Sequence, residues 1–117
     1  MIRVQNKTRE TTVATDVRAA RSFWSRLRGL LGTSPLNPGE GLLIEPCSSV
    51  HMFGMTYPLD VIFSDRRGVV VGVVENLRPW KATKVYRGAR VALELPVGSV
   101  SASGTEAGDS LEFEEWN

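Results

Sequence analysis

The sequence predicts an α+β fold in which a small, mostly antiparallel, β-barrel-like sheet packs against one amphipathic helix. Three observations support this prediction. Short runs rich in β-branched residues recur between turn residues, one segment has helical periodicity, and closure into a barrel would remove exposed sheet edges. The length of 117 residues suits a single domain, 1–117, built around one core.

A single amphipathic helix is predicted over residues 18–31. At about 100° per residue, its apolar side chains share one arc, and every Arg and Ser lies outside it. Thr15 or Asp16 would cap the start of the helix, and Gly32 would end it. The exposed arginines resemble a nucleic-acid footprint, but a net charge of +1 favours a solvated face instead.

The rest of the chain is predicted to form short strands, beginning with an N-terminal hairpin. The expected extended segments are residues 2–5, 11–14, 41–45, 61–64, 69–75, 82–86, 90–95 and 110–113. The sequence 65–68 is typical of a tight hairpin turn, because Gly68 can adopt positive φ. The run 69–74 is apolar except for Gly72, which predicts a strand buried on both faces and bent at that glycine.

Composition narrows the expected location and partners. The charge of +1 gives no general electrostatic reason to bind nucleic acid or anionic lipid. Cys47 is the only cysteine, so it cannot form an intramolecular disulfide, and the N-terminus lacks the apolar stretch of a signal peptide. No run approaches the roughly 20 apolar residues of a membrane span. We therefore expect a soluble, cytoplasmic protein without nucleic-acid partners, membrane partners or a cofactor.

Unusual side chains concentrate between Cys47 and Asp60. These fourteen positions hold the only Cys, the only His (His51) and two of the three Met. Thiol, imidazole, thioether and carboxylate chemistry is therefore available within one short segment. The first hypothesis is a non-enzymatic module that binds a small ligand or a protein near His51, Met55, Asp60 and Trp80. Trp80 would either stack on the ligand or cover one end of the barrel.

Two acids that interrupt predicted apolar strands support an enzymatic alternative. Asp60 interrupts an apolar strand on the side of Ile62 and needs a partner, for which Arg28 is the candidate. Glu94 raises the same question in its own apolar strand. If the fold brought Asp60 and Glu94 together, they could act with His51 as a general acid and base in a hydrolase-like or lyase-like reaction.

A second alternative is soft-metal binding through Cys47, His51 and Met55, whose ligand types select Cu(I). A closed zinc site would need further Cys or His ligands, which the chain lacks. Cys47 and His51 could also form a thiol nucleophile and its base. The simplest interpretation needs no metal. In it, Cys47 is a small buried apolar group, Met52 and Met55 fill gaps in the core, and His51 bonds a carbonyl.

Several motifs in order resemble the domain of unknown function 192 family, also called uncharacterised protein family 0127. They are Arg26–Gly32, Gly39–Ile44, Val50–Asp60 with Val61–Phe63, Leu93–Gly98, and Gly104 with Gly108-Asp109. The resemblance spans about residues 10–114 and implies a small β-rich domain of bacteria or archaea without an assigned activity. Many relatives are similar to exported or membrane-anchored proteins, with Trp and Lys where this chain has Phe53–Thr56. Cys47, His51 and the absence of an export signal place this chain nearer the intracellular variant.

Overall fold

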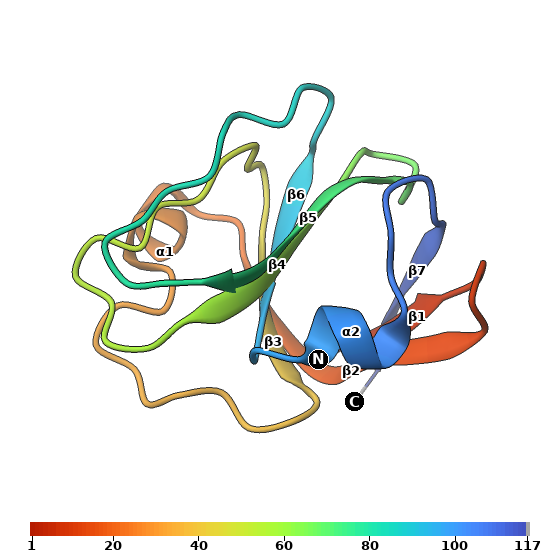
Figure 1. The fold of residues 1–117 in the computed structure, drawn as a ribbon, viewed down its shortest axis with the longest axis horizontal. Coiled ribbons are helices and arrows are strands. Elements are labelled where there is room, and N and C mark those ends of the chain that lie inside the picture. The colour runs from red at the N-terminus through yellow and green to blue at the C-terminus, as the bar shows by residue number, and fades with distance from the viewer. Residues whose placement is uncertain (117) are drawn as a thin grey trace.

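The computed structural model describes residues 1–116 and contains one curled, seven-stranded sheet with two short helices (Figure 1). Along the sheet, the strand order is β5-β4-β6-β3-β2-β1-β7. The elements in chain order are β1 (Ile2–Asn6), β2 (Thr11–Ala20), α1 (Phe23–Arg28), β3 (Glu40–Ile44), β4 (Leu59–Ser64), β5 (Val70–Leu77), β6 (Val91–Leu95), α2 (Ser99–Ser103) and β7 (Leu111–Glu115). All neighbouring strands are antiparallel except β2 and β3. The predicted α+β class with a curled sheet is confirmed.

The central strands β4 and β6 are buried along their whole length. Because successive side chains of a strand point to opposite faces, each of these strands contributes to two separate cores. Ile62 and Leu93 belong to the first core, which also contains side chains of β1, β2, β7 and α2. Val61 and Ala92 belong to the second core, together with the buried methionines of the 50–55 segment.

The predicted helix over residues 18–31 is wrong in its extent and its packing. Residues 18–20 instead extend β2, the strand that begins at Thr11. They pair in parallel with residues of β3, and this pairing gives their backbone groups hydrogen-bond partners in the sheet. The helix covers only Phe23–Arg28, with Ser22 as its N-cap and Gly29 as its C-cap. None of its residues is buried. It therefore does not seal the sheet with an apolar face.

Other predicted elements have mixed outcomes. The N-terminal hairpin is confirmed by β1–β2 pairing, and the turn at 65–68 by a hydrogen bond from Gly68 N–H to the Asp65 carbonyl. The prediction that the run 69–74 is buried on both faces is wrong, because buried and half-buried residues alternate along the first half of β5. Gly72 packs against the ring of Tyr86, and the β4–β5 register is irregular beside it. The predicted strand 82–86 is wrong, since only one isolated bridge, from Ala82 to His51, forms there. Helix α2 was not predicted, because a segment of five residues is too short to show a helical period.

Within residues 1–116, no helix has the length and apolar character needed to cross a membrane.

Asp60 is fully buried in β4 and accepts three backbone hydrogen bonds. Its Oδ1 atom accepts from Asn76 N–H at 2.9 Å, and its Oδ2 atom accepts from Gly98 and Val100 N–H at 3.0 Å each. Asn76 has a left-handed φ of 53° in β5, and Gly98 is the N-cap of α2 without a side chain to cap it. Asp60 thus supplies the missing cap and joins α2 to the irregular part of β5.

We predict that Asp60→Asn lowers the free energy of unfolding by about 2–4 kcal/mol, because an amide nitrogen would face backbone N–H donors and leave them unpaired in the core. Urea unfolding at neutral pH checks this. Glu112→Gln, an exposed acid of β7, is the control and should change stability by less than about 0.5 kcal/mol. Equal stability of the two variants would contradict the structural role given to Asp60.

Candidate functional site

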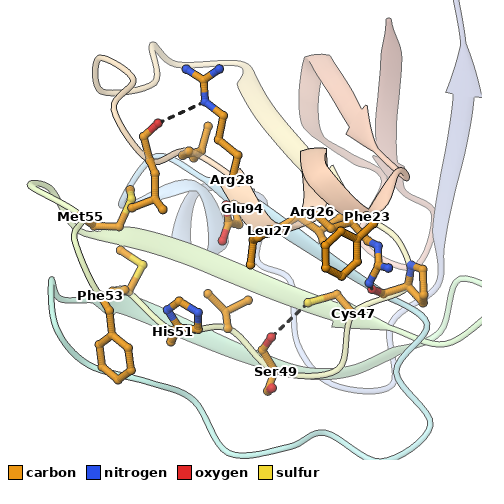
Figure 2. A pocket seen from close by; sticks show the side chains of 17 residues that line it. Phe23, Arg26, Leu27, Arg28, Cys47, Ser49, His51, Phe53, Met55 and Glu94 are labelled. Atoms are coloured by element: carbon orange, nitrogen blue, oxygen red, sulfur yellow. Dashed lines mark hydrogen bonds between the residues drawn. The ribbon is translucent and has the colours of Figure 1, made fainter.

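A cavity of about 230 Å³ opens between the segment that contains α1 and the segment 46–55, with β6 contributing Glu94 (Figure 2). We call it the α1 pocket. Most of its wall is apolar, with side chains that include Phe23, Leu27, Leu30, Ile44, Val50 and Met55. Its polar side chains include Arg26, Cys47, His51 and Glu94. The pocket therefore combines an apolar wall with a few separate polar groups, which is typical of small-molecule sites.

Glu94 reaches the α1 pocket because of its position in β6. It pairs with Leu42 of β3 on one side and Val61 of β4 on the other, in the middle of the sheet. Alternation places it on the face of Ala92, and this face forms the second core. Only 5% of the residue is exposed. A carboxyl group has thus been placed in largely apolar surroundings.

The Glu94 carboxyl group has no partner within residues 1–116. No described side chain or backbone group donates a hydrogen bond to it or forms an ion pair with it, so burial alone raises its pKa to about 7. An unpaired buried carboxylate is costly, and it is commonly neutralised or paired in proteins. Glu94 is therefore the strongest indication of function in the structure, because its hydrogen-bonding capacity is unused and faces a cavity.

Cys47 lies in the same pocket but is not activated. Its Sγ atom donates a hydrogen bond to the Ser49 carbonyl at 3.1 Å. Burial raises the thiol pKa, the nearby Glu94 carboxyl raises it further, and the Ser49 bond and Arg26 oppose the shift only partly. The thiol therefore stays protonated at neutral pH. Since the thiolate is the nucleophile, these surroundings disfavour the predicted cysteine nucleophile.

His51 and Met55 both line the α1 pocket, as the ligand-binding hypothesis required. The His51 ring stacks on Phe53 at 4.8 Å between ring centroids, and Phe53 stacks on Trp80 at 6.1 Å. Trp80 lies at the outer end of this row, does not line the pocket, and is 67% exposed. It therefore does not cover the end of the sheet.

Asp60 lies outside the pocket, and two predictions about it are wrong. In the β4–β6 ladder, Asp60 is opposite Leu95 while Val61 is opposite Glu94, so the two carboxyl groups lie on opposite faces of the sheet. They cannot form the predicted acid–base pair with His51. The predicted ion pair with Arg28 is also absent from the described residues. Arg28 is exposed, and its Nε atom donates to the Leu31 carbonyl at 3.5 Å.

Cys47, His51 and Met55 all line the α1 pocket, so the three ligands proposed for copper lie at one site. The part of the chain between Met1 and Trp116 contains no group of three His, Cys, Asp or Glu side chains placed to hold a metal ion. Met55 would have to complete the ligand set, and metal binding stays a prediction. Sequence reasoning missed Arg26 and Leu27 as pocket residues, since only the fold brings α1 over the 46–55 segment. It also missed Phe53, which lies within that segment.

We predict that Glu94→Gln raises stability at pH 8 but not at pH 5. The pKa of Glu94 is about 7 in the folded protein and 4.5 ordinarily, so the folded state binds more protons between these values. Stability of the unaltered protein should therefore fall as pH rises through this window, by about 3 kcal/mol. Glutamine carries no such penalty.

Urea unfolding of both proteins at pH 5 and pH 8 measures this difference, with Glu112→Gln as the control for loss of an exposed acid. The control should keep the fall in stability between the two pH values. If Glu94→Gln kept the full fall as well, Glu94 would not be the group that titrates.

Known proteins share both sequence and fold with this chain. The model of the family described as "Uncharacterized ACR, COG1430" (DUF192) matches residues 4–113. A UPF0127 protein of Thermococcus sibiricus is 34% identical over 116 residues, covering 93% of this chain and 73% of the relative. The UPF0127 protein PF1050 of Pyrococcus furiosus is 32% identical over 118 residues, covering 96% of both chains.

Two solved structures have the same fold. A protein of unknown function from Novosphingobium aromaticivorans has a TM-score of 0.81 at 21% identity, covering 95% of this chain and 82% of its own. A Sinorhizobium meliloti protein, described only as a proposed transcription regulator, has a TM-score of 0.82 at 25% identity, covering 96% and 91%. The resemblance seen in the sequence motifs is confirmed, and the chain belongs to the uncharacterised DUF192 (UPF0127) family.

Proposed function

We propose that the protein binds a small organic ligand in the α1 pocket, and that Glu94 holds the polar group of that ligand. The observation that carries the proposal is the unpartnered Glu94 carboxyl group, which is 5% exposed and opens into an apolar cavity. A ligand with a hydrogen-bonding group would satisfy this carboxyl group, while its apolar part would contact Leu27, Leu30 and Met55.

Binding without catalysis fits the pocket better than an enzymatic role. Acid–base catalysis with two carboxyl groups needs both of them at one site, and Asp60 faces the other core. The Cys47 thiol is a poor nucleophile because its pKa is raised. Glu94 is left as a single carboxyl group, which suits the recognition of a polar group.

The entrance of the pocket also favours a ligand. Phe23 and Leu27 of α1 are 63% and 59% exposed, and both line the cavity. Phe53 lines it from the opposite segment and is 50% exposed. A bound molecule would cover part of this apolar surface, and covering it contributes roughly 25 cal/mol for each Å² removed from water.

A variant that fills the entrance tests the proposal. Ser49 is exposed and lines the α1 pocket, so Ser49→Trp should obstruct the cavity without disturbing either core. With 1-hexanol as the probe, two-dimensional NMR should show shifts confined to pocket residues in the unaltered protein. The Ser49→Trp variant should show at least a fivefold weaker response.

Ser101→Trp is the matched control, because Ser101 is exposed on α2 and lies outside the pocket. It should bind 1-hexanol as the unaltered protein does. Shifts spread over the whole surface, or equal binding by both tryptophan variants, would show that the α1 pocket is not the binding site.

A further inference from the structure

Glu94 forms no ion pair with any described cation that lines the α1 pocket. Arg26 and Arg28 are its basic neighbours on α1, but neither forms an ion pair with it. Arg26 Nη1 lies 3.4 Å from the Pro46 carbonyl, and Arg28 Nε lies 3.5 Å from the Leu31 carbonyl. Figure 2 shows the Arg28 guanidinium pointing away from Glu94, toward the outside of the pocket. No described cation therefore contacts the Glu94 carboxyl group, which leaves it able to pair with a positive charge that a ligand brings.

The geometry points to a ligand class: we infer that the α1 pocket takes a primary ammonium group on a short aliphatic chain, with the ammonium paired to Glu94. This inference rests on the proposed function and specifies its ligand. An ammonium group donates up to three hydrogen bonds and supplies the missing positive charge. A carboxylate ligand would instead be repelled by Glu94 once that group is ionised.

The wall of the pocket fits the aliphatic part of such a ligand. Leu30, Ile44 and Met55 provide apolar contacts, and Leu30 and Met55 are themselves almost fully buried. Each CH₂ group transferred from water to such a wall tightens binding by about fourfold. Chain length should therefore raise affinity until the cavity of about 230 Å³ is filled.

Pairing of an ammonium group with Glu94 would make the affinity for the ligand depend on pH. Pairing with an ammonium group favours the ionised form of Glu94, whose pKa is about 7 in the unliganded protein. Affinity should therefore rise about tenfold between pH 6 and pH 8, following the ionised fraction of the free protein. A neutral ligand that accepts a hydrogen bond from protonated Glu94 would show the opposite trend.

The other titratable or charged groups that share the pocket are Arg26, Arg28, Cys47 and His51. The raised pKa of Cys47 keeps its thiol neutral. His51 is a further polar side chain of this set, and His51→Gln is the variant that separates its contribution from that of Glu94.

The test measures dissociation constants by titration calorimetry for three probes of equal chain length: n-hexylammonium, 1-hexanol and hexanoate. We expect n-hexylammonium to bind the unaltered protein at least tenfold more tightly than 1-hexanol at pH 8, with hexanoate the weakest. The Glu94→Gln variant should lose this preference and its pH dependence. The His51→Gln variant should keep both.

Four other binding results would contradict the ammonium assignment, the binding site or both. Equal binding of n-hexylammonium and 1-hexanol would overturn the ammonium assignment but leave the proposed ligand site intact. Tighter binding of hexanoate would also overturn it and would assign recognition to Arg26. Failure of all three probes to bind would remove both the ligand class and the proposed function. A preference for n-hexylammonium that survives in Glu94→Gln would exclude Glu94 as the anchor.

Discussion

The burial of β4 and β6 on both faces is the constraint on which the rest of this structure depends. When a strand is buried on both sides, neighbouring side chains enter different cores, and a polar residue must be satisfied within whichever core it enters. Asp60 enters the core with Ile62, and Glu94 enters the core with Val61. One antiparallel ladder therefore separates the two acids that the sequence suggested as a pair.

Asp60 and Glu94 are both buried acids, but Asp60 has a structural role and Glu94 is the candidate for a functional one. Asp60 accepts hydrogen bonds from three backbone amides, and its two carboxyl oxygens organise the start of α2 and the irregular region of β5. Glu94 is similarly inaccessible but has no donor, and burial raises its pKa to about 7. Because the first carboxyl group is satisfied and the second is not, Glu94 is the one of these two acids with hydrogen-bonding capacity left for a molecule from outside.

The short helix α1 explains why a pocket exists beside Glu94. Residues 18–20 are used in the parallel pairing of β2 with β3, and the helix that follows covers only the six residues Phe23–Arg28. A helix this short does not lay an apolar face on the sheet, and Phe23 and Leu27 stay largely exposed at the entrance of the cavity. The 46–55 segment closes the opposite side. The same pairing that shortened the predicted helix thus left the space that a ligand would occupy.

The sequence by itself determined the local features: the positions of most strands, the turn at 65–68, and the faces of β4 and β6 on which Asp60 and Glu94 lie. These follow from two-residue alternation and turn chemistry, which act over a few neighbouring residues. Only the tertiary structure decided that Asp60 is held by Asn76, Gly98 and Val100, and that α1 lies over the 46–55 segment. Those partners are distant in sequence, and their selection depends on strand pairing and shared burial, which local patterns do not encode.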